Sequence, residues 1–235
     1  MRQDDDRDQA RGPGPMNGAP LLPVLQLSML LQAYQSRLRR LGDDIDPSWL
    51  DRLAREDGFT CAPELAPQWR SAQLRVRLRL GPVAPAVFTP PAHRLATLDK
   101  PALLVVLTAR ALYAHRAALA RCVDGVLLTR LRSLVGAPAL AVLRAVGAGV
   151  APGRGGDPAP APTPLSGAAT LLDWAVDGYA LFERDGAWRD ATLRRLVQVM
   201  LPAGAAAAPG EPTGDSAALV ALLPTLFPEL AWLFG

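Results

Sequence analysis

The sequence predicts an all-α fold, and its composition and periodicity are the observations that predict it. Half of the 235 residues are hydrophobic but only 6% are aromatic, so the core must be built mainly from Leu, Val and Ala. Alanine and leucine have high helix propensity and little preference for strands. Apolar residues also recur every three or four positions through most of the chain, as along one face of a helix. We expect a single irregular multi-helix domain over residues 21–235.

Residues 1–20, "MRQDDDRDQARGPGPMNGAP", are acidic, polar and rich in Pro and Gly. Such a segment cannot bury enough apolar surface to offset the entropy of ordering, so we expect a disordered extension. It also differs from a secretory signal, and no run of about 18 uncharged apolar residues predicts a membrane span. The nearest run, residues 101–123, is interrupted by three arginines. We therefore expect a cytoplasmic protein.

The chain is basic, with a net charge of +3, and Lys100 is its only lysine. Together with the abundant Ala, Gly and Pro, this favours a compositional bias over a surface selected to bind polyanions. Cys61 and Cys122 lie far apart, without a Cys/His cluster around either. We expect two reduced, buried thiols, with a disulfide as the alternative.

The first helices are indicated by their boundaries. Pro23 suits a first helical turn, apolar residues follow at helical spacing from Val24 to Leu41, and Gly42 is the expected stop. In residues 44–59, Asp46 is the expected N-cap and Pro47 the first helical residue, with Gly58 as the stop.

Residues 63–81 fit two patterns. Trp69, Gln73, Val76 and Leu80 form a helical stripe, whereas Leu74, Val76, Leu78 and Leu80 alternate with polar residues as in a strand. The run follows a helical start, which favours the helix.

After a proline-rich connection, Asp99 is the expected cap of a long helix that runs to about Val123, and Asp124 begins another. Further helices are expected over 137–149, 166–186 and 187–202, with Pro/Ala-rich linkers at 147–165 and 202–215. The last segment ends in "FPELAWLFG", which we expect to dock on its own domain rather than on a partner.

His115 and Cys122 are the soft metal ligands of the predicted long helix. Seven residues return to nearly the same face but rise roughly 10 Å, too far to share one zinc ion or to form a Cys–His pair. We expect both in an apolar stripe, with Arg110, Arg116 and Arg121 pointing away. His93, in a proline-rich loop, is expected to be exposed.

Motifs of known enzymes and of nucleotide-binding loops are absent from the sequence. "GRGGD" at 153–157 lacks the Lys-Ser/Thr ending of a phosphate loop and is interpreted as linker. Asp43 and Asp44 are expected to face the N-terminus of the following helix, a structural role. We expect no enzyme activity, no catalytic residue, no metal, no cofactor and no small-molecule substrate.

A helix–turn–helix DNA-binding protein is the alternative interpretation. Residues 110–136 have the pattern of two helices joined by a short turn. Arg130 and Arg132 lie about 200° apart around the second helix, so they do not form one reading face. We therefore expect no binding to nucleic acid.

The order of several segments carries a family resemblance. "LAPQWRSAQL", with Pro67–Arg70 at its centre, is followed by "ARALYAHRAALARCVDGVLLTRLRSLVG" and then by "LLDWAVDGYALFERDGAWRDATLRRLVQVMLP". Over about residues 44–235 this resembles the SctK/YscK family, cytosolic sorting-platform accessory proteins of bacterial type III secretion systems.

The resemblance implies a mostly helical structural adaptor without a cofactor. It would link an SctD-like inner-membrane ring protein, through its cytosolic domain, to the SctQ-like C-ring or pod protein. The protein would then lie at the cytosolic face of the inner membrane, held there by its protein partners. The family offers no short functional motif, so the partner-binding residues stay unknown. By residue type alone, Trp49, Trp69 and Arg70 are candidates for contacts, with core packing of the tryptophans as the alternative.

Overall fold

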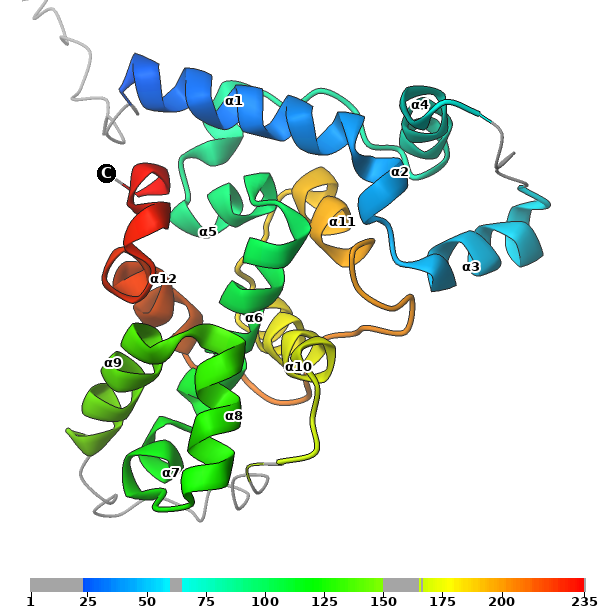
Figure 1. The fold of residues 1–235 in the computed structure, drawn as a ribbon. Helices are drawn as coiled ribbons and strands as arrows, with labels where there is room; N and C mark the ends of the chain where they lie inside the picture. The colour runs from blue at the N-terminus through cyan, green and yellow to red at the C-terminus, as the bar shows by residue number, and fades with distance from the viewer. Residues whose placement is uncertain (1–22, 60–64, 150–164, 166, 235) are drawn as a thin grey trace, which may run out of the picture.

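The computed structural model describes residues 23–59, 65–149, 165 and 167–234, and in these ranges the chain is helical, with no β-strand (Figure 1). The all-α prediction is confirmed. The α-helices of these ranges are α1 (Val24–Arg39), α2 (Leu41–Asp44), α3 (Pro47–Asp57), α4 (Pro67–Arg77), α5 (Pro91–Arg94), α6 (Lys100–Ala114), α7 (Arg116–Arg121), α8 (Gly125–Val135), α9 (Ala137–Ala148), α10 (Leu171–Arg184), α11 (Ala191–Gln198) and α12 (Asp215–Leu226). Short 3-10 helices are η1 (Pro85–Phe88), η2 (Leu95–Thr97) and η3 (Pro228–Leu233).

Helix α6 is the centre of the fold, and helices α8, α9, α10 and α12 pack around it (Figure 1). From Leu103 to Tyr113, every residue of α6 except Leu104 and Val105 is buried. Helix α10 approaches it most closely, at Gly178. A Cβ atom there would overlap the carbonyl oxygen of Leu107, so only glycine permits this crossing.

Helices α1, α2 and α4 form a layer at one end of the molecule, with α1 lying across the rest (Figure 1). Helix α1 is fixed to the core by buried Leu30, Tyr34 and Leu38. The Tyr34 hydroxyl donates to the Gly81 carbonyl at 2.6 Å. Helix α3 projects beside this layer and is held through Trp49, whose indole N–H donates to the carbonyl of Leu201 at 2.9 Å.

Several expected helix boundaries are confirmed. The side chain of Asp46 caps α3, and Gly58 ends that helix with a φ of 61°, in the left-handed region that glycine tolerates best. Asp99 caps α6 and Asp124 caps α8 through their side chains. Residues 67–77 are helical, so the helix interpretation of that ambiguous run is also confirmed.

Gly42 is not a helix stop. Helix α1 ends at Arg39, and Gly42 lies inside the short α2. Its position is explained by packing, because its backbone N–H donates to the Ser71 hydroxyl at 3.0 Å and a Cβ would crowd that oxygen. Asp44 is likewise buried and pairs with Arg37 instead of facing the next helix, whose N-terminus is capped by Asp46.

The expected long helix from Asp99 to Val123 is wrong in its second half. The helix breaks at His115, and α7 leaves in a new direction. The break is stabilised by tertiary packing, because α7 lies against α9 where Gly147 meets the carbonyl group of Arg116. His115 and Cys122 therefore do not share one continuous helix.

The C-terminal segment docks on its own domain, as expected. Phe227, Leu230 and Leu233 are buried, and η3 packs against α12 and α1. Gln26 of α1 donates to the Leu233 carbonyl at 3.1 Å, and Arg94 donates to the same oxygen at 2.7 Å.

Residues 202–214 run without regular structure, as predicted for the second linker, but they stay on the domain. Ala205 is buried, and Ala208 donates a backbone hydrogen bond to Ala180 of α10 at 2.9 Å. The expected extension (1–20), the loop "GRGGD" and most of the first linker lie outside the described residues, as does Cys61.

Candidate interaction surfaces

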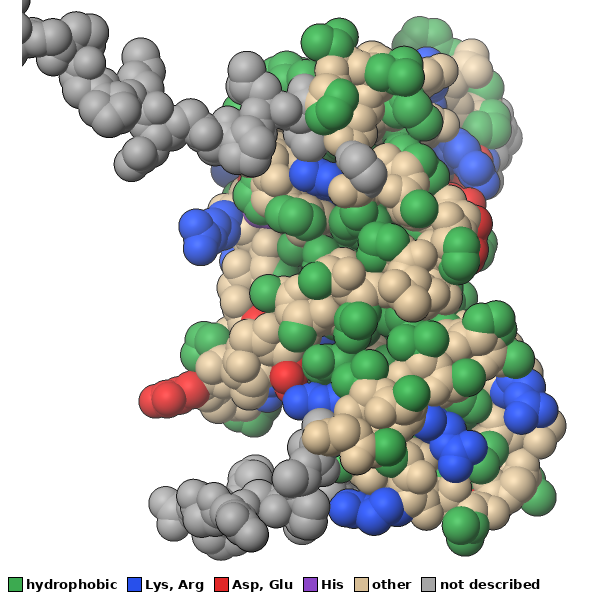
Figure 2. Space-filling view, turned by 90° about the vertical axis from the view of Figure 1, so that its left-hand side faces the viewer, with side chains coloured by type: hydrophobic (Ala, Val, Ile, Leu, Met, Phe, Trp, Pro, Cys, Tyr) green, Lys and Arg blue, Asp and Glu red, His purple; other side chains and the backbone are tan. Residues whose placement is uncertain are grey.

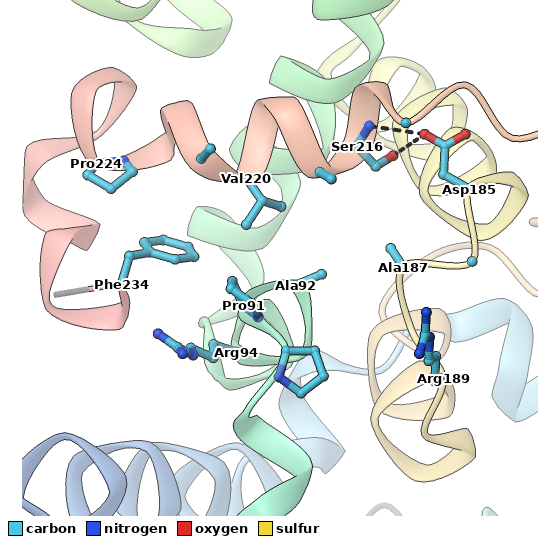
Figure 3. Close-up of a pocket in the computed structure, with 15 residues that line it drawn as sticks. Pro91, Ala92, Arg94, Asp185, Ala187, Arg189, Ser216, Val220, Pro224 and Phe234 are labelled. Atoms are coloured by element: carbon cyan, nitrogen blue, oxygen red, sulfur yellow. Dashed lines mark hydrogen bonds between the residues drawn. The ribbon is translucent and has the colours of Figure 1, made fainter. Parts of the chain in front are cut away.

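A cavity of about 650 Å³ lies between α5, α12 and the turn after α10 (Figure 3). Its wall is largely apolar, with Pro91, Val220 and Phe234 around it. Arg94 borders it but is already bound, because it donates to the carbonyls of Phe88 and Leu233. Arg189 is exposed, and its guanidinium has no hydrogen-bond or ion-pair partner within the described residues.

The polar end of this cavity is a buried ion pair and its hydrogen bonds. Arg110 is fully buried, and its guanidinium lies 3.0 Å from the Asp185 carboxylate, whose side chain is 3% exposed. Ser216 donates to that carboxylate from its hydroxyl at 2.6 Å and from its backbone N–H at 3.0 Å (Figure 3). Arg110 also donates to the Ser216 hydroxyl at 2.8 Å. Three elements, α6, the end of α10 and α12, are joined here.

The charge state of Asp185 follows from this environment. Burial alone would raise its pKa, but hydrogen bonds from Ser216, from the Thr213 backbone and from Arg110 outweigh burial and hold the pKa well below its ordinary value. Asp185 is therefore an anion that balances the buried Arg110. The groups at this end of the cavity are engaged with one another, which gives them a structural role.

Arg110 was expected to point into solvent, and that prediction is wrong. Arg116 is also partly buried, pairs with Asp215 at 3.1 Å and stacks on the ring of Tyr113 at 4.3 Å. Of the three arginines, Arg121 is the exposed one. The sequence did contain a signal for the burial of Arg110, because this charged residue lies in the middle of the most apolar run and a charge is buried only with a partner. Its partners, Asp185 and Ser216, are more than 70 positions away in the sequence.

The histidines do not lie as expected either. His93 is 4% exposed rather than solvent-accessible. Its Nδ1 lies 2.6 Å from the Val87 carbonyl, and its Nε2 accepts the backbone N–H of Arg189 at 3.0 Å, so it links α5 to the start of α11. His115 is partly buried, with its ring edge-on to Trp174 at 5.8 Å, and burial lowers its pKa.

Cys122 is half-buried at the end of α7, with a free thiol. Clusters of three or more His, Cys, Asp or Glu side chains able to hold a metal ion are not found within the described ranges.

The three residues that were candidates for partner contacts differ in solvent exposure. Trp49 is 3% exposed and belongs to the core, as the alternative interpretation held. Arg70 is half-buried and lies 3.7 Å from Asp43. Trp69, in contrast, is 62% exposed. It is the member of the set that is free to contact a partner.

Trp69 belongs to a surface that we name the α4 face, made of Trp69, Gln73 and Val76. Val76 is 78% exposed, and Gln73 lies between the two on the same side of the helix. The helix buries its other side through Ser71 and Leu74, against α2 and α1. Of the predicted stripe of four residues, the three on α4 are exposed, whereas Leu80 is buried but follows the end of the helix.

A second exposed apolar surface, the α1 end, consists of Val24, Leu25 and Met29. These side chains are 85%, 74% and 40% exposed. Figure 2 views the side of the molecule where α1 begins and η3 lies, and it shows hydrophobic side chains over much of this side with few acidic ones. This surface was not predicted from the sequence, where Val24 was counted only as the first apolar residue at helical spacing.

Helix α8 is the second helix of the helix–turn–helix alternative, and one of its two arginines is already hydrogen-bonded within the protein. The Arg130 guanidinium donates to the carbonyls of Gly167 and Ala169, where it holds the chain that leads to α10. Arg132 is exposed on another side of the helix. The two do not form a shared reading face, as expected from their spacing.

Within the described ranges, no individual helix has both the length and the apolar character needed to cross a membrane. Helices α8 and α9 together pass such a test by length and composition, but they are bent by 118° relative to each other.

Comparison with known proteins finds a family whose model matches most of the chain. The model of a family described as "Bacterial type III secretion protein (HrpB4)" matches residues 23–229. Neither the curated proteins nor the solved structures contain a significant match to the chain.

Proposed function

The chain belongs to the HrpB4 family of bacterial type III secretion proteins, which is of the SctK/YscK type, and from this premise we propose that it is a structural adaptor of the secretion sorting platform. It would act in the cytoplasm, at the cytosolic face of the inner membrane. Its partners would be an SctQ-like pod protein and the cytosolic domain of an SctD-like ring protein. No small molecule, cofactor or catalytic step is part of this proposal.

The observation that carries the proposal is the separation of the α4 face from the α1 end. An adaptor must hold two partners at once, and these two apolar surfaces lie near opposite ends of α1 (Figure 1). A helix of 16 residues spans roughly 24 Å, so the two surfaces are separated by nearly the diameter of a small domain. Exposed apolar surfaces of this kind commonly mark protein interaction sites.

Each surface has a candidate anchor by residue type. Tryptophan is enriched among the residues that dominate binding energy, so Trp69 is the expected anchor of the α4 face. At the α1 end, the Leu25 side chain is 74% exposed, more than that of Met29. It would insert into an apolar pocket of the partner.

The test measures binding of the purified protein to an SctQ-like protein and, separately, to an SctD-like cytosolic domain. Trp69→Ala should weaken binding of one partner about 30-fold, equivalent to about 2 kcal/mol, and leave the other unchanged. Leu25→Glu should do the reverse. In cells, deletion of the protein should block secretion while the membrane rings still assemble and the pods stay unattached.

Two results would contradict the adaptor proposal. One is the absence of binding to either partner at micromolar concentration. The other is retention on duplex DNA at physiological salt with a steep salt dependence, which would favour the helix–turn–helix alternative instead.

A further inference from the structure

A groove rich in arginine lies between α3, α4 and α11, and its Arg79 also borders a shallow hollow that includes Val76 of the α4 face. Two adjoining hollows of about 210 and 250 Å³ form it, and they share Leu78, Arg79 and Arg195. Trp49 and Arg52 of α3 border one hollow, and Arg194 of α11 borders the other.

The positive charge of this groove is incompletely balanced. Arg52 pairs with Glu56 at 2.9 Å, and Arg194 lies 3.8 Å from Glu183. The other three arginines that line or flank the groove have no carboxylate within ion-pair distance among the described residues: Arg77, Arg79 and Arg195.

Two of the guanidinium groups are held in place by one buried ring. Arg52 and Arg195 lie over the Trp49 indole, at 5.3 and 5.6 Å from its centroid. Cation–π contacts of this kind orient a guanidinium without neutralising it. Several like charges are thereby kept close together, an arrangement that favours binding of a group with the opposite charge.

Arg79 adds an independent observation from the backbone. Its φ is 55°, and among the described residues it is the sole non-glycine residue with a positive φ. It follows the end of α4, where the N–H of Leu80 donates to the Arg75 carbonyl at 2.8 Å, a closing turn in which glycine is the preferred residue. An arginine in this disfavoured conformation points to a use for its side chain.

We propose that this groove binds an acidic segment of a partner protein through its carboxylates. Guanidinium groups bind carboxylates with paired, charge-assisted hydrogen bonds, and Arg79 stands between the two hollows where it can contact such a segment on both sides. Binding of single-stranded nucleic acid needs aromatic faces on which bases stack. Trp49 is 3% exposed and lies beneath two guanidinium groups, so the groove offers carboxylate-binding cations rather than a stacking surface.

The test uses the full-length protein and a labelled peptide of about 12 residues that alternates Glu with Gly, with fluorescence anisotropy as the readout. A peptide with Gln in place of Glu is the neutral control, and a single-stranded oligonucleotide of equal charge is the competing probe. The acidic peptide should bind, the neutral peptide should not, and the oligonucleotide should bind more weakly than the acidic peptide.

Arg79→Gly separates the role in binding from a role in stability. It should weaken peptide binding at least fivefold, yet raise the melting temperature by about 2 °C because glycine suits the left-handed backbone. Arg195→Gln should weaken binding similarly. Arg132→Gln, an exposed arginine on α8 with no ion pair among the described residues, is the matched control and should leave binding unchanged.

The proposal is overturned if Arg79→Gly binds the acidic peptide as tightly as the unaltered protein. It is also overturned if Arg132→Gln weakens binding as much as Arg79→Gly, since binding would then follow total charge. Tighter binding of the oligonucleotide than of the acidic peptide would assign the groove to nucleic acid. None of these results depends on whether the secretion partners bind the two apolar surfaces.

Discussion

Arg110 and Asp185 form an ion pair at 3.0 Å in the interior, although 75 positions separate them in the sequence and their side chains are 0% and 3% exposed. The pair lies where α6, α10 and α12 meet, and Ser216 of α12 completes its hydrogen bonds. A charge so placed is stable only while its partner remains.

Asp185→Asn should therefore destabilise the protein strongly. The change leaves the Arg110 cation buried without a counter-charge, which costs about 3–5 kcal/mol in comparable pairs. Urea denaturation followed by circular dichroism measures the loss. Glu56→Gln, which breaks the exposed pair with Arg52, is the control and should cost less than about 0.5 kcal/mol. Equal costs for the two variants would contradict this account of the pair.

Gly178→Ala should also destabilise, for a steric reason. The added Cβ would overlap the carbonyl oxygen of Leu107, so α6 and α10 would have to move apart. Overpacking of a buried site typically costs about 1–3 kcal/mol and occasionally more. Gly125→Ala is the matched control, because no atom lies within 4 Å of a Cβ at that position. Differential scanning calorimetry should show a lower melting temperature for the first variant and no decrease for the second.

The stability of the protein should decrease as the pH falls from about 7.5 to 5.5, through His115. Burial lowers the folded-state pKa of this histidine below its ordinary value of 6.5, while Asp177 opposes the shift in part. The unfolded chain then binds protons that the folded protein does not, so stability is full above the unfolded pKa and is lost as the pH falls toward the folded one. His115→Phe, which keeps a ring against Trp174, should reduce this slope. Melting temperatures of both proteins, measured from pH 5.5 to 7.5, test this prediction. If the pH dependence is unchanged in the variant, groups other than His115 cause it.

Leu233→Ala should cost about 2–5 kcal/mol, because this side chain is fully buried where η3 docks on α1 and α5. Leu25→Ala, on the same helix that receives η3 but 74% exposed, should change stability by less than about 0.5 kcal/mol. Chemical denaturation of the two variants distinguishes docking of the C-terminal segment from a free tail. A small loss for Leu233→Ala would mean that the segment does not contribute to the core.

Local signals in the sequence predicted the helices well where a short-range interaction decides the boundary. Asp46, Asp99 and Asp124 cap helices through side chains that reach backbone N–H groups two or three residues away. Gly58 ends α3 because it adopts a positive φ at little cost. These interactions involve neighbours in sequence, so the sequence alone contains both partners.

The direction in which a helix faces was harder to predict. Both sides of α4 carry apolar residues, with Leu74 on one side and Trp69 and Val76 on the other. Periodicity shows that such a segment is a helix but does not say which side meets α2 and α1. The exposure of Trp69, and with it the α4 face, became evident only when the neighbouring helices were in place.

By itself, then, the sequence determined the all-α class, most helix boundaries and the resemblance to a type III secretion family, because propensity, capping and motif order are properties of adjacent residues. Tertiary structure decided the break at His115, the burial of Arg110 and His93, and the grouping of Arg79 with Arg195 beside Trp49. Each of these depends on residues that are distant in sequence and close in space. The energy of a buried charge or a close helix crossing belongs to both partners at once, so neither segment alone reveals it.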